Sequence, residues 1–188
     1  TSKNNINIDE KNINLMMGAN AHLVIYPINK KNELNSVCIV RQKNFEPDNV
    51  KDLINKKVLN QNPNLKELFQ GDLKPWPLYS TISVNQSSNK KVFYLGDAFH
   101  GLLPTMAQGA SQSIEGAYEL FNLLKKNNEN MHETYFNNRS KRLKIIKKRS
   151  DFNFLMFHFS TSVAKIIRNL FLKYLVKNKK FISYYLGE

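Results

Sequence analysis

Residues 94–113 read YLGDAFHGLLPTMAQGASQS, and this stretch decides how the rest of the chain is interpreted. A short apolar run ends at Gly96-Asp97, a loop containing Pro104 follows, and a helix is predicted to begin near Gly109. Ligands of α/β folds commonly bind at the carboxyl ends of strands, where this aspartate would stand. The stretch therefore predicts a ligand-binding edge of a sheet.

The residue types of this stretch suit one class of ligand. The Asp97 carboxylate can accept hydrogen bonds from sugar or ribityl hydroxyls, and glycines at 96 and 109 allow close approach of the backbone. A helix that starts near Gly109 offers unpaired N–H groups and the positive end of its dipole, which stabilise negative charge such as that of a reduced flavin. Taken singly, however, a Gly-Asp pair after a strand is more often a plain turn, and Ala110 can simply begin a helix.

The flanking sequence predicts a mixed fold of the α/β class, with an α+β arrangement within this chain. Residues 13–28 and 34–41 are rich in β-branched and apolar side chains on either side of a polar turn, which predicts a β-hairpin or meander. Alternation along the first of these segments places His22, Val24 and Tyr26 on one face.

Hydrophobic spacing and proline positions predict the remaining elements. Residues 73–85 are predicted to be extended, and residues 91–95 to form a short strand. Helices are predicted at 48–60 (opened by Pro47), 63–70, 108–126, 130–149 and 151–177. These elements predict three domains. Residues 1–85 form part of a β-sheet domain with short helices, residues 86–127 form the strand and helix of the opening stretch, and residues 128–188 form a C-terminal helical region.

Composition and charge narrow the possible partners. The chain has 188 residues, 41% of them hydrophobic, so it can bury a core as one domain or as half of a larger one. Its net charge of +13 could favour nucleic acid, but lysine and asparagine are spread along the whole chain. The basic residues are dense only at 139–149 (RSKRLKIIKKR), and no RNA-binding signature or zinc-finger spacing occurs. A solvated surface therefore explains the charge better.

The number of cysteines and the length of the apolar runs indicate the cellular compartment of the protein. Cys38 is the only cysteine, so no disulfide can form within the chain and an oxidising compartment is not indicated. No apolar stretch is long enough for a transmembrane helix, and a cytoplasmic location is expected. Residues 163–182 are amphipathic and basic, which suits a bilayer surface. A core-packing helix with a solvated face is the favoured alternative for this segment.

The opening stretch resembles the second FAD-binding motif of the class A flavoprotein aromatic hydroxylases, the group that contains 4-hydroxybenzoate and salicylate hydroxylases. Two flanking segments resemble the same family: MGANAHLVIYPI at 17–28, and a Tyr-x-x-x-Arg-x-x-Arg run followed by a Phe-His pair within 135–159. The order and spacing of the motif are kept in Gly96-Asp97-Ala98-Phe99-His100, Pro104, Ala107-Gln108-Gly109-Ala110 and Ile114-Glu115.

The resemblance implies a flavin site in the opening stretch. Asp97 would contact the ribityl chain of FAD, and Pro104 would lie against the isoalloxazine ring. The backbone amides around Gly109 and Ala110 would face the pyrimidine edge of the flavin. The cofactor-binding residues implied in this way are Gly96, Asp97, Pro104, Gln108, Gly109 and Ala110.

The resemblance also assigns roles to histidines and a tyrosine. His22 and Tyr26 would lie on the substrate side of the sheet, and His22 is the better candidate for a substrate contact and a catalytic role. Packing is the alternative for His22. His100 is expected to be structural or flavin-adjacent, and His158, in the run FLMFHF, to be a buried core histidine.

The family reaction implies an enzyme in which FAD, reduced by NAD(P)H, uses O2 to hydroxylate a small aromatic substrate, without a metal and without nucleic acid. The four histidines show no metal-ligand spacing, which agrees with this expectation. Two alternatives remain open. One is a flavin hydroxylase of a lipidic or quinone precursor at a membrane surface, and the other is a non-enzymatic, basic nucleic-acid-binding protein.

The sequence departs from the family pattern in three places. Gly116 and Ala107 stand where the family usually has aspartate and glycine. The sequence also contains no G-x-G-x-x-G, the fingerprint that holds the ADP half of a dinucleotide. The resemblance therefore implies the C-terminal half of such an enzyme, part of a Rossmann-like FAD-binding fold whose N-terminal dinucleotide-binding half is missing.

Overall fold

A computed structural model describes residues 8–28, 33–42, 44, 49–126, 129–175 and 177–186 of the chain. The chain forms two compact units, one made of residues 1–77 and 156–188 and the other of residues 78–155. Helices are combined with a three-stranded antiparallel sheet, so the expected mixed helix-and-sheet class is confirmed. The Rossmann-like fold and the three domain ranges 1–85, 86–127 and 128–188 stay predictions.

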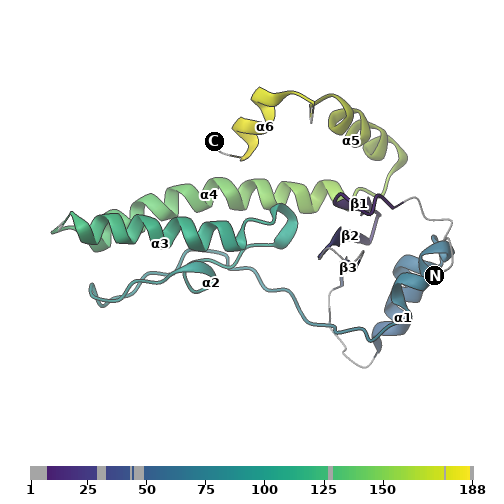
Figure 1. Cartoon of the computed structure of the whole chain (residues 1–188), viewed down its shortest axis with the longest axis horizontal. Coiled ribbons are helices and arrows are strands. Elements are labelled where there is room, and N and C mark those ends of the chain that lie inside the picture. Colours follow the sequence, from purple (N-terminus) through teal and green to yellow (C-terminus); the bar gives the residue numbers. More distant parts are fainter. Residues whose placement is uncertain are drawn as a thin grey trace. The chain divides into compact units, whose positions relative to one another are not determined.

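The first unit contains a three-stranded meander, one of the two arrangements predicted from residues 13–28 and 34–41 (Figure 1). Its strands are β1 (Asn14–Met17), β2 (Ala21–Pro27) and β3 (Leu34–Val40), paired in the order β1-β2-β3. The turn between β1 and β2 closes with a 2.9 Å hydrogen bond from the Gly18 amide to the Ala21 carbonyl. Cys38 of β3 pairs with Leu23 of β2, and burial raises the pKa of its thiol to about 11.

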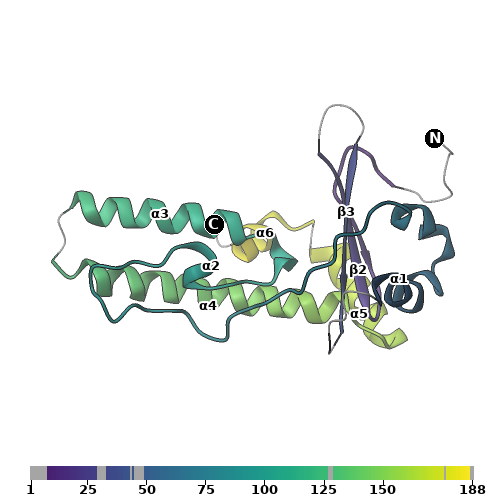
Figure 2. The same cartoon turned by 90° about the horizontal axis from the view of Figure 1, so that it is seen from below.

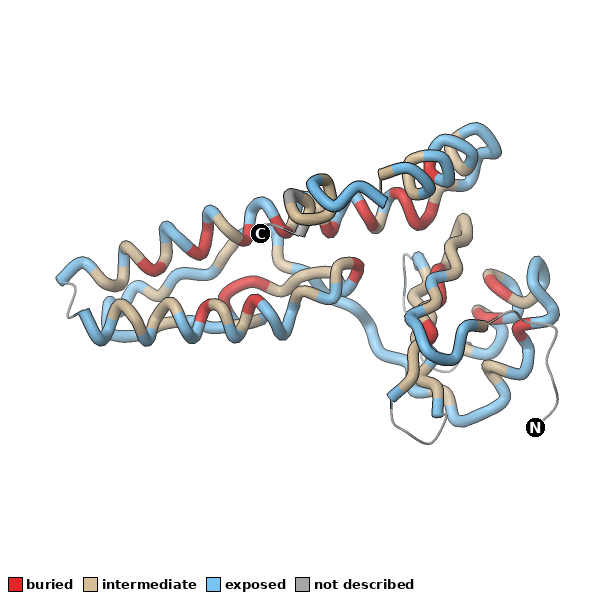
Figure 3. Tube along the Cα trace, turned by 45° about the horizontal axis from the view of Figure 1, so that its top comes forward, coloured by how far each residue is buried: buried red, intermediate tan, exposed pale blue. Residues whose placement is uncertain are grey.

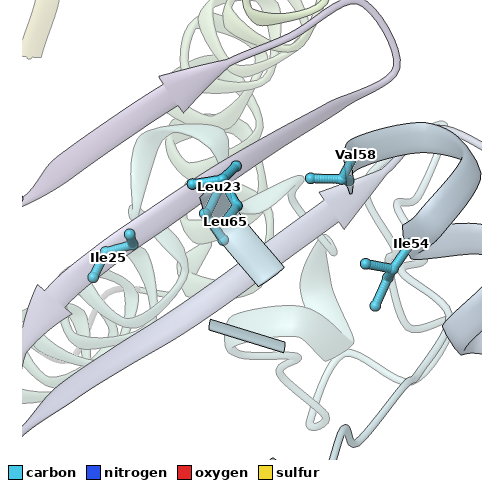
Figure 4. Packing of buried hydrophobic residues seen from close by; sticks show 5 residues of the cluster. All are labelled: Leu23, Ile25, Ile54, Val58 and Leu65. Carbon is cyan, nitrogen blue, oxygen red and sulfur yellow. The ribbon is translucent and has the colours of Figure 1, made fainter. Parts of the chain in front are cut away.

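Short helices cover one face of this sheet, as Figures 2 and 4 show. The helix α1 (Val50–Ile54) continues into a π-helical turn, η2 (Asn55–Leu59), and η3 (Pro63–Phe69) is a 3₁₀ helix. Alternation places Leu23 and Ile25 of β2 on the covered face. There they form a buried cluster together with Ile54, Val58 and Leu65. The predicted helices at 48–60 and 63–70 are thus found, whereas Pro47 lies outside the described residues.

The helices α5 (Ser162–Leu175) and α6 (Lys179–Leu186) complete the first unit. They contact each other through the rings of Phe171 and Phe181, whose centroids are 5.8 Å apart in an edge-to-face arrangement. The Arg168 side chain of α5 is buried and donates to the side chain of Asn169 and to the Met156 carbonyl.

The second unit consists mainly of two long helices that lie side by side (Figure 1). These are α3 (Gly109–Lys125) and most of α4 (Met131–Phe157). The segment before them contains a four-residue helix, α2 (Gly96–Phe99), and a 3₁₀ turn, η4 (Pro104–Met106). Its core is aromatic, with Phe99, Tyr135 and Leu143 buried against Phe93 and Phe136.

The predicted strand at 91–95 is wrong. Residues 92–95 form no ladder, and Gly96-Asp97 open α2 instead of ending a strand. The reason is that the Tyr94 carbonyl accepts a 3.1 Å hydrogen bond from the Tyr135 hydroxyl of α4, so a side chain takes the place of a neighbouring strand. The segment 73–85 is irregular and extended, as predicted, and its Asn85 amide bonds the Phe99 carbonyl at 2.8 Å.

The predicted helix break at residue 150 is also wrong. The helix α4 runs through Ser150, and the break falls at 158–161. A buried group of hydroxyls accounts for the difference, because Ser150 Oγ donates to the Leu103 carbonyl at 2.9 Å and Thr105 Oγ1 donates to the Ser150 carbonyl at 2.7 Å. Asn153 adds a bond to the Thr105 carbonyl. The polar residues of this helix face the loop around Pro104 instead of ending the helix.

Two buried serines of α4 provide a test of this arrangement. Ser150→Ala should lower the free energy of unfolding by about 1–3 kcal/mol, because it removes the hydrogen bond from the buried Ser150 hydroxyl to the Leu103 carbonyl. Ser140 is buried as well, but its hydroxyl has no hydrogen-bond partner within the described part of the chain. Ser140→Ala should therefore be neutral or stabilising. Urea denaturation of both variants measures the difference, and equal losses would contradict the assignment.

Candidate functional site

The opening stretch folds around a narrow pocket in the second unit. Its cavity has room for about one water molecule, so a larger ligand would lie across its mouth. Asp97 and Gly109, predicted as ligand contacts, both line it, and the side chain of Asp97 is exposed. The lining residues are Gly96, Asp97, Phe99, His100, Leu102, Gly109, Gln112, Tyr135, Arg139 and Leu143.

Gly96 is required by its backbone conformation. Its φ is +54°, in the left-handed region that residues with a Cβ adopt at a cost. A Cβ at this position would also stand 2.7 Å from Ser113 Oγ of α3. The glycine thus lets α2 begin directly against α3, which places the Asp97 carboxylate at the pocket.

The turn before α3 contains a second left-handed residue, Ala107, with φ +51° and ψ +31°. This is the position where the sequence departs from the glycine of the family motif. An alanine there costs roughly 1–2 kcal/mol relative to an ordinary right-handed backbone, so the conformation explains the glycine preference.

The amino-terminal end of α3 is open to solvent and has no side-chain cap. Gln108 occupies the cap position without a capping hydrogen bond, and no acidic residue lies in the first turn. Gly109 and Ala110 are exposed, and a Cβ added at Gly109 would meet no atom within 4 Å. Free amides and the positive dipole end therefore face open space beside Asp97, which suits a carbonyl oxygen or an anion. Pro104, which opens η4, is exposed as well.

His100 has a structural environment. It is buried, and its Nδ1 contacts the Thr81 hydroxyl, which in turn accepts a 3.0 Å hydrogen bond from the Gly101 amide. Burial lowers the pKa of His100, so the ring is neutral at neutral pH. These contacts tie the segment around residue 81 to the end of α2, and His100 lies in the pocket wall. The structural part of the expectation for His100 fits this position, and a place next to the flavin stays a prediction.

A buried arginine joins the two long helices below the pocket. Arg139 of α4 is 2% exposed and donates to Glu115 Oε1 at 2.7 Å. It also donates to the Gln112 side chain at 2.7 Å and to the Gln112 carbonyl at 3.2 Å. Arg142, one turn further along, reaches the same Glu115 oxygen at 3.0 Å. The Tyr-x-x-x-Arg-x-x-Arg run therefore fastens α4 to the helix that begins at the site.

Tyr135, the first residue of that run, packs against Gly116. A Cβ added at Gly116 would lie 3.2 Å from the Tyr135 hydroxyl and 3.5 Å from Arg139 Nε. The glycine that replaces the usual family aspartate thus permits α3 to approach the tyrosine closely. The residue types alone do not predict that Gln112, Tyr135 and Arg139 line the pocket. The family resemblance covers Tyr135 and Arg139 only as members of the Tyr-x-x-x-Arg-x-x-Arg run.

His22, on the sheet of the first unit, is 2% exposed. Its Nδ1 lies 3.1 Å from Nε2 of His158, and its ring meets Phe157 edge to face. Burial and the neighbouring His158 lower the pKa of His22 to about 4. With this pKa, His22 is neutral at neutral pH and is a weak base, which favours packing or neutral hydrogen bonding over proton abstraction. His158 is buried, as expected for a core histidine.

Tyr26 lies at the other end of β2. It is half-buried, and its hydroxyl accepts a 2.7 Å hydrogen bond from the Asn35 side chain of β3. His22 and Tyr26 belong to the first unit, whereas the pocket belongs to the second. A substrate role for either residue stays a prediction.

Two kinds of feature are absent from the described residues. No group of three or more His, Cys, Asp and Glu side chains is placed there to hold a metal ion. In that same part of the chain, none of the helices is long and apolar enough to cross a membrane.

Comparison with protein families places the chain in one of them. The model of a protein family described as FAD binding domain matches residues 10–150, which is more than half of the chain. No curated protein matches the sequence.

Replacement by alanine should affect stability differently at the two pocket glycines, Gly96 and Gly109. Gly96→Ala should destabilise the chain by at least about 1–2 kcal/mol, because of the left-handed backbone and the contact with Ser113. Gly109→Ala should change stability by less than about 0.5 kcal/mol, since its Cβ points into open space. Thermal unfolding of both variants measures this contrast, and a large loss at Gly109 would show that the helix start is packed.

The Glu115 ion pairs should make stability depend on pH. Burial alone would raise the pKa of Glu115, but hydrogen bonds from Arg139 and Arg142 outweigh it and lower the pKa below the ordinary 4.5. The stabilisation is complete above 4.5 and is lost as the pH falls through the lower, folded-state pKa. The difference in melting temperature between wild type and Glu115→Gln should therefore narrow as the pH is lowered from about 6 to about 3.

A matched variant controls for general acid effects. Asp72→Asn changes an exposed carboxylate of the first unit and should follow the wild type over the whole pH range. A constant gap between wild type and Glu115→Gln down to the lowest pH would show that Glu115 does not titrate in this range.

Proposed function

The chain belongs to the FAD-binding domain family, and from this premise we propose that it contacts the flavin of a monooxygenase. In this proposal the enzyme uses NAD(P)H and O2 to hydroxylate a small aromatic substrate. When bound, FAD supplies the redox chemistry, and the protein supplies position, polarity and exclusion of water. The observation that carries the proposal is the uncapped start of α3 beside Asp97, within the region that matches the family.

The residues at the pocket fit a flavin. The amides at the start of α3 have no side-chain partner, no acidic residue lies in the first turn, and Gly109 borders open space. Such a helix start can accept the carbonyl edge of a flavin pyrimidine and stabilise negative charge that develops there. The pocket itself is too small to enclose a ring system, so the flavin would lie on the surface formed by this turn and helix.

Each of the predicted cofactor residues has a role in this proposal. Asp97 would accept hydrogen bonds from the ribityl hydroxyls, and Pro104 would offer a rigid apolar surface to the ring. Gly96 would act through the backbone, since its conformation places Asp97. Gln108, Gly109 and Ala110 would present their amides to the pyrimidine edge.

The substrate side is proposed to include the sheet of the first unit, with His22 and Tyr26 as candidates. With its lowered pKa, His22 would serve as a neutral hydrogen-bonding group and not as a base. The tyrosine hydroxyl is already engaged by Asn35, so Tyr26 would orient a substrate only while keeping that bond.

A separate dinucleotide-binding unit is proposed to hold the ADP half of FAD. The 188 residues contain no G-x-G-x-x-G. The helix α3 has an exposed apolar stripe, made of Ile114, Tyr118, Phe121 and Leu124, each more than half exposed. A stripe of this kind normally packs on another element, which supports a further unit beside α3.

The alternative of a nucleic-acid-binding protein receives less support from the same helices. It depended on the basic block at 139–149, where Arg139 and Arg142 are committed to Glu115, and Lys147 is paired with Asp151 at 2.6 Å. These pairs reduce the positive charge that the block offers to a phosphate backbone.

Titration with FAD tests the flavin site directly. The chain should bind FAD and quench the fluorescence of the flavin. If the chain alone binds FAD weakly, the titration is repeated with the dinucleotide-binding unit added. Asp97→Ala should weaken binding about tenfold, because it removes a charged hydrogen-bond acceptor. Gly109→Leu should weaken it further by filling the open space at the helix start.

Asp72→Ala, which removes an exposed carboxylate of the first unit, should bind FAD as the wild type does. If the protein takes up no FAD even with the dinucleotide-binding unit present, the monooxygenase proposal is wrong. If FAD binds but neither Asp97→Ala nor Gly109→Leu affects it, the flavin site lies elsewhere.

A further inference from the structure

The helix α5 has two apolar faces, and only one of them is packed. The packed face carries Arg168, which is 6% exposed, with the half-buried Phe171 and Leu175 beside it. The second face is open, and most turns of α5 are drawn as exposed in Figure 3. It consists of Val163, Ile166, Ile167, Leu170 and Tyr174, each between 51% and 67% exposed.

The open residues form one continuous stripe. At about 100° per residue, their positions fall within an arc of about 100° along three turns of helix. A helix of a soluble protein usually carries a single apolar stripe, which it buries, so a second exposed stripe of this size indicates an interaction surface.

The charged residues that flank this stripe along the sequence are of one sign. Between residues 152 and 187 the sequence contains six basic residues and no acidic residue: Lys165, Arg168, Lys173, Lys177, Lys179 and Lys180. Lys173, on α5 itself, is exposed, and its Nζ lies 5.8 Å from the centroid of the Tyr174 ring. Lys177, Lys179 and Lys180 are exposed as well.

We propose that α5 docks on the surface of a membrane that contains anionic lipids. An exposed apolar stripe with a basic border is the pattern of a helix that lies in the plane of the bilayer interface. The apolar side chains enter the acyl boundary, and the lysines meet the lipid phosphates. A polyanion such as RNA would satisfy the charge but would leave the apolar stripe in water. The inference does not depend on flavin binding.

Vesicle co-sedimentation of the full chain tests this inference. The wild type should bind vesicles of mixed phosphatidylcholine and phosphatidylserine, bind phosphatidylcholine alone much less, and be released by high salt. The double variant Ile166→Asn/Leu170→Asn should reduce binding to the mixed vesicles by about tenfold or more, because it makes the stripe polar. Lys173→Gln/Lys180→Gln should reduce binding to the mixed vesicles and flatten the dependence on salt.

The exposed stripe of α3 provides a matched control. It is also apolar and more than half exposed, but the helix carries Glu115 and Glu119. Tyr118→Asn/Phe121→Asn should leave vesicle binding unchanged, and circular dichroism should show that all variants keep the helical content of the wild type.

Three results would overturn the proposal. The first is absence of wild-type binding to the mixed vesicles, and the second is an equal loss with the α3 variant, which would indicate non-specific hydrophobic adsorption. The third is a chain that self-associates in analytical ultracentrifugation and becomes monomeric in Ile166→Asn/Leu170→Asn, because a second copy would then cover the stripe.

Discussion

The buried guanidinium of Arg139 is the constraint on which the second unit depends. A cation taken out of water must be paired and fully hydrogen-bonded, or the fold loses several kcal/mol. Arg139 meets this condition through Glu115 and Gln112, which lie three residues apart on the same face of α3. Satisfying one charge therefore sets the rotation and the height of α3 against α4. Because the site begins at the first residue of α3, this ion pair also fixes where the open amides stand.

The loop that precedes α3 is positioned by the same partner helix, through neutral groups. Ser150 and Asn153 donate to the Leu103 and Thr105 carbonyls on either side of Pro104. The Tyr135 hydroxyl donates to the Tyr94 carbonyl at the entry to α2. The opening stretch thus has few contacts of its own and is shaped by α4 at both ends. The turn before α3 is held by these contacts, while Gly109 and Ala110 at the start of the helix stay exposed.

The parts of the fold that follow local rules could be predicted from the sequence. The meander of β1 to β3 and the helices around 50–69 and 109–125 follow from side-chain alternation, helical spacing and proline positions. The prediction of a strand at 91–95 used the same rules and was wrong, because a ladder needs a neighbour and Tyr135 supplied a single hydroxyl instead. The prediction of a helix break near Ser150 was wrong because polar residues there serve a distant loop.

The residues of the candidate site also divide into those that local sequence predicts and those that it does not. Gly96, Asp97 and Gly109 could be placed at one pocket from the order of their motif, since they are local in sequence. Arg139 could not be derived from residue types as a pocket residue, because its burial depends on the pairing with Glu115, 24 residues earlier. The contact of His22 with His158 spans 136 residues and carries no local pattern. Sequence periodicity therefore does not predict the long-range polar contacts of the fold.

The single thiol of the chain, on Cys38, can report on local opening of the sheet in the first unit. Cys38 is half-buried on β3, and its raised pKa keeps it in the unreactive protonated form near neutral pH. A disulfide reagent should therefore react with it faster when that part of the sheet opens. The rate of modification therefore measures local opening of one unit, while the aromatic core around Phe99 and Tyr135 contributes nothing to the signal. The chain thus carries a reporter of the first unit alone, without an introduced label.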